Sequence, residues 1–391
     1  MPGHSDAARP IQGRARVCQL DWFINSRCDY ACRHCVPGAC GKGRRDVDLA
    51  ACRKVLRSFL SFCAAQQRQA RIAFFPRQAE FVEPFLTILR DAAAARRSGR
   101  LGQIVSANRG DLPADKIRLF ADAGVDACRL TIDGPKAVQD FLRRPGSFRD
   151  TLTAFRAARD SGIRVIPLLI LVRHNAPHVA RTMRMLLDDG FDGFTLQVGI
   201  RGDAGTGNRL ASVHPDPSSP WNDLLTASDY RAVLLRALNF LDTTGPAHRE
   251  ERAQFVLRHP MYARLFFELG RLNEYERLDA HHRREDILPF VLRPDGSVLC
   301  QQQMPELGTF PGGSFQKMFD TAHPLHWFGR GASLVSYMAR KQRTFFKCRD
   351  CPVSRHCPPE LVGAQGRRLF FQPDVHCWVE EKESVKHAAT N

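Results

Sequence analysis

The feature that most constrains the fold is a regular alternation of short apolar runs with longer amphipathic stretches over residues 17–200. The apolar runs have the length of strands, and most of the stretches between them repeat apolar residues every three or four positions, as helices do. This alternation indicates βα units around a parallel sheet. The expected strands are 17–24, 70–75, 103–107, 127–132, 164–172 and 193–198, and the expected helices are 49–68, 83–97, 114–122, 148–161 and 176–189.

Six such strands predict an α/β protein, either a partial six-strand βα barrel or an open sheet, with its active site beyond the carboxyl ends of the strands. Residues 201–220 are rich in Gly, Pro, Ser and Asn, which is typical of a linker or loop, and their glycines do not form a phosphate-binding motif. Further helices are expected at about 228–241 and 261–275. A β-hairpin is expected over 290–300, turning at 294–296.

Length and charge limit the function classes. A chain of 391 residues favours about two domains, and no apolar run is long enough to cross a membrane. The net charge of +16 would suit an anionic partner. The arginines are spread through helices and loops and no RNA-binding fingerprint is present, so nucleic-acid binding is disfavoured.

Cysteine usage carries most of the functional information. The N-terminal segment 1–16 is polar and lacks the apolar core of a signal peptide, so we expect a disordered N-terminus and a cytoplasmic protein. Thirteen cysteines in a reducing compartment point to metal binding or catalysis rather than to disulfides. Cys18, Cys40, Cys52, Cys63 and Cys128 are interpreted as structural thiols.

Three other cysteines stand in one short loop directly after the first expected strand. Cys28, Cys32 and Cys35 form CxxxCxxC. A structural zinc site needs four ligands, whereas an iron-sulfur cube held by three cysteines leaves one iron open for a small molecule. The alternatives are a zinc site completed by His34 or Cys40, and chance clustering.

The motif resembles the signature CxxxCxΦC of the radical S-adenosylmethionine (SAM) superfamily, with His34 at the Φ position. Residues 130–148, LTIDGPKAVQDFLRRPGSF, resemble the fourth-strand segment of the subgroup with SPASM or twitch extensions. Residues 106–110 resemble the TNG turn after its third strand.

The resemblance implies a 4Fe-4S cluster on the triad and SAM as cofactor. The usual GGEP segment is altered here, and its place falls on Gln78, Ala79 and Glu80. The SAM contacts implied by position are Ser106, Asn108, Thr131, and Arg173 or Arg201. A capping threonine and a surface arginine are the alternatives for the last three.

A second cysteine set lies near the C-terminus, at Cys348, Cys351, Cys357 and Cys377. Four thiolates suit zinc or an iron-sulfur cluster. The resemblance to the SPASM pattern implies a single auxiliary 4Fe-4S cluster, because Leu361 stands where another cysteine would fall. Such a closed cluster suits electron transfer.

Cys300 is placed where relatives have a cysteine that faces the active site. It is interpreted as a hydrogen-atom donor, as an odd cluster ligand or as a relic thiol. Gln301 follows it where some sulfatase-oxidising relatives place an aspartate, which disfavours that activity.

The resemblance predicts an oxidoreductase that generates a 5′-deoxyadenosyl radical to abstract a substrate hydrogen. The favoured substrate is a ribosomally made peptide that is cross-linked or oxidised in natural-product biosynthesis. Alternatives are dehydrogenation or epimerisation of a small molecule such as an aminocyclitol or sugar, and a non-catalytic iron-sulfur protein. A flavodoxin or ferredoxin is expected as reductant. Only 27 residues precede the triad, so either a separate leader-binding protein or a leaderless mode would be needed.

The domain organisation expected from these segments has four parts. They are the N-terminal segment 1–16, a barrel over 17–220, a helical bridging segment over 221–289, and a smaller cysteine-rich SPASM/twitch-like domain over 290–391.

Overall fold

The computed structural model of the chain describes residues 15–25, 32–34, 48–76, 83–108, 110, 112–191, 195–198, 225–244, 261–282, 285–300, 306–323, 346–357, 360–365, 368–372 and 377–378. Every structural statement below refers to these residues. Within them, no helix is both long enough and apolar enough to cross a membrane.

The centre of the fold is a sheet with the strand order β6-β5-β4-β3-β2-β1-β7-β8-β9. Its first six strands in chain order pair in parallel, each with the next. Their bounds confirm the expected strands to within two residues: β1 (Ala15–Phe23), β2 (Gln69–Phe75), β3 (Gln103–Asn108), β4 (Ala127–Thr131), β5 (Arg164–Leu171) and β6 (Thr195–Val198).

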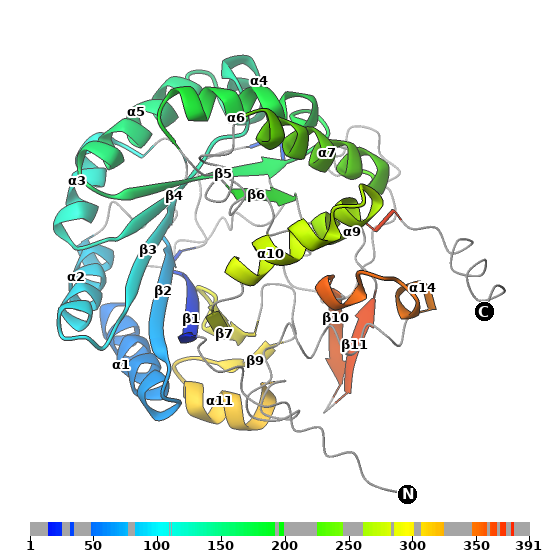
Figure 1. The fold of residues 1–391 in the computed structure, drawn as a ribbon. Helices are drawn as coiled ribbons and strands as arrows, with labels where there is room; N and C mark the ends of the chain where they lie inside the picture. Colours follow the sequence, from blue (N-terminus) through cyan, green and yellow to red (C-terminus); the bar gives the residue numbers. More distant parts are fainter. Residues whose placement is uncertain are drawn as a thin grey trace, which may run out of the picture.

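Helices connect these strands on the outside of the curved sheet (Figure 1). They are α1 (Leu49–Ala65), α2 (Glu83–Arg97), α3 (Ala114–Asp122), α4 (Lys136–Leu142), α5 (Ser147–Asp160) and α6 (Val179–Asp188), the last preceded by the 3-10 turn η2 (Ala176–His178). The arrangement confirms the partial barrel predicted from the alternation. The short helix α4 is an addition to the sequence-based expectation.

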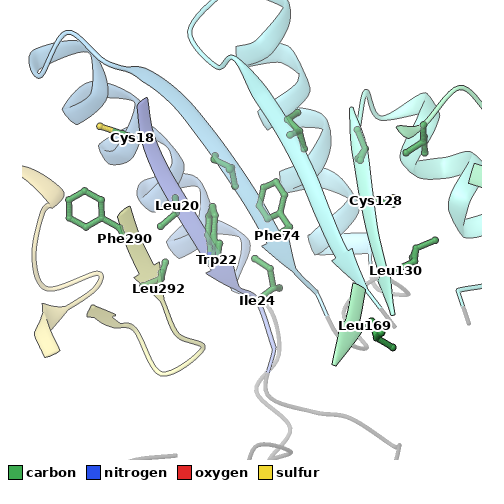
Figure 2. Packing of buried hydrophobic residues seen from close by; sticks show 14 of the residues in the cluster. Cys18, Leu20, Trp22, Ile24, Phe74, Cys128, Leu130, Leu169, Phe290 and Leu292 are labelled. Atoms are coloured by element: carbon green, nitrogen blue, oxygen red, sulfur yellow. The ribbon is translucent and has the colours of Figure 1, made fainter. Parts of the chain in front are cut away.

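Strand alternation divides the sheet into two faces. Cys18, Leu20 and Trp22 of β1, with Ile24 directly after it, are buried and belong to the main hydrophobic core beneath the helices (Figure 2). From α1, Phe59 and Phe62 enter the same core. Burial of each such side chain contributes about 1.5–3 kcal/mol, so this layer fixes the register that places the strand ends.

A seventh parallel strand changes the expected domain boundary. β7 (Glu285–Leu292) pairs with β1, with Asp21 opposite Val291, and continues into the antiparallel strands β8 (Ser297–Leu299) and β9 (Glu306–Thr309). The expected boundary between residues 289 and 290 therefore falls inside a strand of the barrel sheet.

The segment after β7 is fastened to the barrel by aromatic packing. Phe290 meets Phe62 at 5.3 Å between ring centroids, and both pack against Phe315 at the start of α11 (Phe315–Ala322). The expected turn at 294–296 is present. Gly296 has a φ of +88°, and a Cβ there would lie 1.9 Å from the carbonyl oxygen of Phe310.

The remaining described elements are helical except for one hairpin. The expected helix over 261–275 is two helices, α9 (Met261–Glu268) and α10 (Leu272–His282), because Gly270 ends the first with a φ of +70°. The others are α7 (Ala227–Thr243), α14 (Phe346–Arg349), η5 (Ser354–His356), and the antiparallel pair β10 (Glu360–Gln365) and β11 (Arg368–Gln372).

Candidate active site

The described part of the cysteine loop is residues 32–34, and it is fastened to the end of α4. The amide of Arg33 donates to the carbonyl of Leu142 at 2.9 Å, and its Nε donates to the carbonyl of Phe141 at 3.1 Å. The Arg33 guanidinium lies 4.1 Å from the centre of the Phe141 ring, which also stacks on His174. Two terminal carbonyls of α4 thus gain donors.

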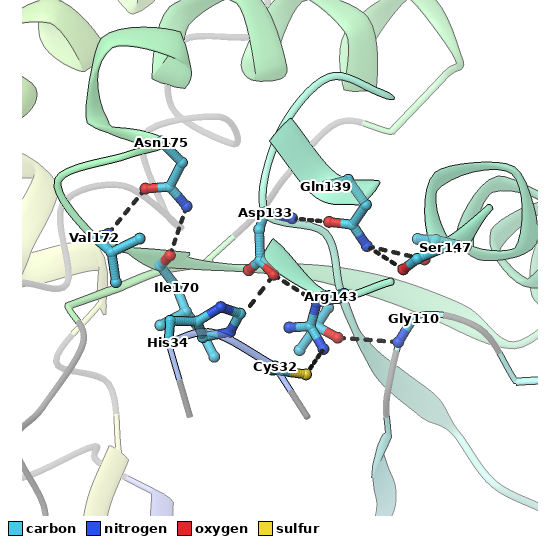
Figure 3. Close-up of polar contacts among 12 residues, drawn as sticks. Cys32, His34, Gly110, Asp133, Gln139, Arg143, Ser147, Ile170, Val172 and Asn175 are labelled. Carbon is cyan, nitrogen blue, oxygen red and sulfur yellow. Dashed lines mark hydrogen bonds and ion pairs between the residues drawn. The ribbon is translucent and has the colours of Figure 1, made fainter. Parts of the chain in front are cut away.

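A buried ion pair lies beside this loop (Figure 3). Arg143 Nε is 2.5 Å from Asp133 Oδ2, and the two side chains are only 6% and 0% exposed. Arg143 Nη1 is 4.0 Å from Cys32 Sγ, and His34 Nε2 is 3.6 Å from Asp133 Oδ2. One expected cluster ligand therefore contacts a buried guanidinium.

The position of Asp133 is fixed from α4 and α5. Its amide donates to Gln139 Oε1 at 2.6 Å, and Gln139 Nε2 reaches Ser147 Oγ at 3.1 Å and Thr151 Oγ1 at 3.3 Å. The second carboxylate oxygen of Asp133 is buried and has no hydrogen-bond partner in the part of the chain that the structure describes.

Two expected SAM contacts lie at the carboxyl end of β3. Asn108 Nδ2 donates to Ser106 Oγ at 2.8 Å, and both residues are buried. Asn108 Oδ1 has no partner among the described residues. A buried amide oxygen without a donor costs about 1–3 kcal/mol, so this atom suits a ligand that brings a hydroxyl or an ammonium group.

Thr131, at the end of β4, binds the neighbouring turn. Its hydroxyl accepts a hydrogen bond from the amide of Gly110 at 3.0 Å. A Cβ at Gly110 would lie 2.0 Å from the Thr131 carbonyl oxygen, so only glycine fits this approach. Among the described residues the Thr131 hydroxyl has no acceptor for its own proton, which can therefore be donated to a ligand.

The other expected SAM contacts are less informative. Arg173 is exposed after β5. The hydrogen bond with Thr226 is the main cause that lowers the pKa of Asp229 on α7, and the positive charge of Arg173 adds a smaller lowering. Gln78, Ala79, Glu80 and Arg201 lie outside the described residues, as do the cluster cysteines Cys28 and Cys35.

The inner face of the sheet carries a small apolar cluster of its own. Ala73, Val105 and Ala127 are buried there, and Phe75 packs against them. Phe75 also stacks on Phe23 at 4.4 Å. Asp21 faces the same side by alternation; burial raises the pKa of its carboxyl against the opposing effects of Arg129 and of the hydrogen bond from Gln19.

Three of the four C-terminal cysteines, Cys351, Cys357 and Cys377, belong to the main core or pack against it. Cys348 and Cys357 are buried, while Cys351 and Cys377 are partly buried. Cys357 Sγ lies 3.9 Å from the sulfur of Met261, the first residue of α9. Within the described residues, no three Cys, His, Asp or Glu side chains are arranged to hold a metal ion, so the structure does not gather this set into a cluster site.

A charged network surrounds these thiols. The carboxylate of Glu268 accepts from Trp378 Nε1 at 2.7 Å, from Arg264 Nε at 2.8 Å and from Arg231 Nε at 2.9 Å. Burial lowers the pKa of Arg264, but its hydrogen bonds and charge interactions with Glu268 and Cys351 outweigh that effect and raise it. Arg264 thus links α9 to one of the four cysteines.

Cys300 directly follows β8, is fully buried and belongs to the main hydrophobic core. Burial raises the pKa of its thiol well above the usual range, so the thiol stays protonated. A protonated thiol is the form that carries a hydrogen atom, whereas a cluster ligand is a thiolate. Cys18, Cys63 and Cys128 are also buried in the core, as expected for structural thiols.

The sequence patterns assign no role to Asp133, Gln139 or Arg143. All three stand in residues 130–148, the segment that resembles the fourth-strand region of the SPASM/twitch subgroup. That resemblance identifies the subgroup but gives these side chains no function. The available signal was the Asp-Gly-Pro at 133–135 and the arginine at 143, charged residues that end up buried.

The fold is similar to that of solved radical SAM enzymes. The structure of anSMEcpe, an anaerobic sulfatase-maturating enzyme, with bound AdoMet and the Kp18Cys peptide matches with a TM-score of 0.61 at 13% identity, covering 96% of this chain and 97% of that chain. Streptococcus suis SuiB bound to S-adenosylmethionine matches with a TM-score of 0.53 at 11% identity, covering 87% and 72%.

A second structure of SuiB, bound to the precursor peptide SuiA, matches with a TM-score of 0.51 at 10% identity, covering 87% of this chain and 71% of that chain. No protein-family model and no curated protein sequence matches the chain. At these identities the likeness establishes the fold, and it agrees with the architecture predicted from the sequence.

Proposed function

We propose that this chain is a radical SAM enzyme whose Cys28, Cys32 and Cys35 hold a 4Fe-4S cluster. One observation carries the proposal. Cys32 follows β1 at the carboxyl edge of the parallel sheet, beside the buried pair of Asp133 and Arg143. This edge is where the active sites of such sheets are built.

The side chains at the carboxyl edge of the sheet fit both a 4Fe-4S cluster and SAM. Three thiolates leave one iron open for a chelating ligand, and the buried oxygens Asn108 Oδ1 and Asp133 Oδ1 lack donors among the described residues. SAM brings an ammonium group and two ribose hydroxyls, which can donate to such oxygens. The altered segment 78–80 remains the predicted place for the ammonium contact.

When bound, the cluster and SAM supply a 5′-deoxyadenosyl radical that abstracts a hydrogen atom from the substrate. The residues of this chain bind and orient the groups around that chemistry. Asn108 and Thr131 present polar atoms at the ends of β3 and β4, and Arg143 directs its guanidinium at Cys32. The apolar cluster of Ala73, Val105, Ala127 and Phe75 on the inner face would help to exclude water from the site.

The test is SAM cleavage by anaerobically reconstituted protein. With a chemical reductant and SAM, the wild type should release 5′-deoxyadenosine, measured by liquid chromatography with mass detection. Cys32→Ala should release none above background. Cys52→Ala is the matched control, because this partly buried thiol on α1 lies outside both cysteine sets.

A wild type that takes up iron but releases no 5′-deoxyadenosine, with or without candidate substrates, would contradict the proposal. It would leave a non-catalytic iron-sulfur protein as the explanation. Equal release by Cys32→Ala and by the control would instead remove the triad from the chemistry.

We further propose that the substrate is a peptide. Two neighbours of similar fold were solved with peptides, Kp18Cys in one case and the precursor SuiA in the other, and the net charge of +16 suits an acidic leader. A short open reading frame beside the gene would supply the candidate peptide. It should stimulate 5′-deoxyadenosine release and lose a pair of hydrogen atoms on oxidation or cross-linking. Stimulation by sugar intermediates alone would favour the small-molecule alternative.

The C-terminal set Cys348, Cys351, Cys357 and Cys377 is proposed to hold an auxiliary cluster. Four thiolates are a suitable donor set, although the structure does not bring three of them within metal-binding reach. The proposal predicts about eight iron atoms per chain, four per cluster. About four would restrict the protein to the first cluster.

A further inference from the structure

The buried pair of Asp133 and Arg143 has a feature that a purely structural ion pair would not need. Its guanidinium is shared: Nε lies 2.5 Å from Asp133, and Nη1 lies 4.0 Å from Cys32 Sγ. The partners come from the end of β4, the end of α4 and the loop after β1 (Figure 3). The cysteine loop, 111 positions away in sequence, thus meets the neighbouring ends of β4 and α4 at one cation.

Desolvation argues against a role in stability alone. Two charged side chains with 6% and 0% exposure lose most of their hydration, and apolar residues of the same size would often stabilise such a position equally well or better. We therefore expect the Asp133–Arg143 pair to have a function through its interaction with a third group. The nearby candidates are Cys32 and His34, both in the cysteine loop.

The direction of the guanidinium is set by the backbone. Asp133 is held through its amide by Gln139, and the Arg143 amide donates to the Gln139 carbonyl at 3.0 Å. The cysteine loop is held at the same place, because the Arg33 amide donates to the Leu142 carbonyl. The Arg143 guanidinium and the loop that carries the Cys32 sulfur are thus both held at the end of α4, at the adjacent residues 143 and 142.

We infer that Arg143 is a positioning residue that donates to the cluster-bound sulfur of Cys32 and raises the reduction potential of the SAM-binding cluster, with Asp133 directing its guanidinium. The inference rests on the proposed function, in which Cys32 is a cluster ligand. Reduction adds a negative charge to the cluster. A cation and a hydrogen bond beside its sulfur stabilise that charge, whereas the carboxylate of Asp133 opposes it.

The two partners should therefore have opposite effects. Arg143→Gln removes the cation and leaves the Asp133 carboxylate, so the potential should become more negative. Asp133→Asn removes the carboxylate and leaves the cation, so the potential should become less negative. We expect about a tenfold change in the reduction equilibrium for Arg143→Gln, which corresponds to about 59 mV for one electron. Simple damage to the loop would not produce shifts of opposite sign.

The experiment is a reductive titration of reconstituted full-length protein followed by electron paramagnetic resonance. The SAM-binding cluster is recognised by the change in its spectrum when SAM is added, because a cluster with four cysteine ligands has no open iron. Arg144→Gln is the matched control, since the neighbouring Arg144 pairs with Asp150 at the surface and is 42% exposed. Arg143→Lys keeps the positive charge but lacks the planar guanidinium that can donate to Asp133 and Cys32 at once, so it should give an intermediate potential.

The outcomes separate this inference from the proposed function. A more negative potential for Arg143→Gln, with Arg144→Gln unchanged and Asp133→Asn shifted the other way, supports the inference. Should Arg143→Gln fail to take up iron, Arg143→Lys still carries the test through its potential. Unchanged potentials, or shifts of the same sign in Arg143→Gln and Asp133→Asn, overturn the inference while SAM cleavage by the wild type still stands. A wild type without a SAM-responsive cluster would instead defeat the proposed function.

Discussion

The two cysteine-bearing regions differ in how their surroundings use polar atoms. The carboxyl edge of the sheet, where Cys32 contacts Arg143, carries two buried oxygens that have no donor within the described chain, Asn108 Oδ1 and Asp133 Oδ1. Around the C-terminal cysteines, the Glu268 carboxylate accepts hydrogen bonds from Arg231, Arg264 and Trp378. The first arrangement suits a ligand that enters and leaves, whereas the second suits a permanent, closed element.

The two regions also differ in how their cysteine-bearing segments are anchored to the fold. Residues 32–34 attach to one helix end through Arg33, whose amide donates to the Leu142 carbonyl and whose Nε donates to the Phe141 carbonyl, so the loop is positioned whatever its cysteine side chains bind. Cys351 and Cys377 are tied to α9 through side chains, those of Arg264 and Trp378. We therefore expect the first region to be sensitive to changes in sheet-edge geometry and the second to changes in charge.

The largest expected effect comes from removing one cysteine in each region. Cys32→Ala should abolish 5′-deoxyadenosine release, whereas Cys351→Ala should retain release and lose product formation. Each variant should lose about half of the iron of the wild type, because each cluster holds four iron atoms. Iron analysis and product detection check this. Loss of 5′-deoxyadenosine in both variants would break the comparison.

The next effect concerns geometry at the sheet edge. In Gly110→Ala the new Cβ would lie 2.0 Å from the Thr131 carbonyl oxygen and 2.5 Å from Thr151 Oγ1. We expect a loss of about 1–3 kcal/mol in the free energy of unfolding and about 10–100-fold weaker SAM binding, because the contact between Thr131 and the Gly110 amide is displaced.

Gly162→Ala is the control for this geometry. Gly162 has a φ of +73° and nothing within 4 Å of a new Cβ, so the variant carries backbone strain of about 1–2 kcal/mol without touching the edge. Urea unfolding and equilibrium dialysis with SAM measure both quantities. Equal SAM binding by the two variants would exclude the Gly110 turn from the cofactor site.

Some elements of the fold could be predicted from the sequence and others could not. The six parallel strands and the turn at Gly296 follow from local patterns, since alternation, helical periodicity and Pro-Asp-Gly are all written in neighbouring residues. The helix α4 is missed because seven residues between Pro135 and Arg143 are too short for a periodic signal. Likewise, the break at Gly270 divides one expected helix into two.

The long-range features could not be predicted in this way. β7 joins β1 across most of the chain, and its apolar run is equally compatible with a hairpin in a separate domain. The contact of Arg143 with Cys32 spans 111 positions and depends on the crossing of three segments. Local pattern identifies which residues carry chemistry, whereas tertiary packing decides which of them meet.

A smaller effect is expected from the charge network on α9. Glu268→Gln weakens three hydrogen bonds to a carboxylate, and we expect a loss of about 1.5–3 kcal/mol in the free energy of unfolding at neutral pH. Burial raises the pKa of Glu268, but the bonds from Trp378, Arg264 and Arg231 outweigh it and hold the pKa below 4.5.

The pH dependence of that loss follows from the lowered pKa. A carboxyl with a depressed folded-state pKa stabilises the protein above its unfolded pKa of about 4.5, and this contribution disappears as the pH falls through the folded value. The stability difference between wild type and Glu268→Gln should therefore shrink below about pH 4.5. Urea unfolding of both proteins between pH 3 and pH 7 measures it. A difference that stays constant with pH would show that the carboxylate is not the stabilising group.

The smallest effect is expected at Cys300, which belongs to neither cysteine set and is fully buried in the core. Cys300→Ala should cost about 1 kcal/mol through the cavity that replaces the sulfur, and should leave 5′-deoxyadenosine release unchanged. If the thiol is a relic, product formation is also unchanged. If the protonated thiol donates a hydrogen atom, as its raised pKa permits, product formation stops while release continues. Deuterium incorporated from heavy water into the wild-type product would then identify Cys300 as the donor and the reaction as an epimerisation. A product without deuterium would show that Cys300 is a structural thiol.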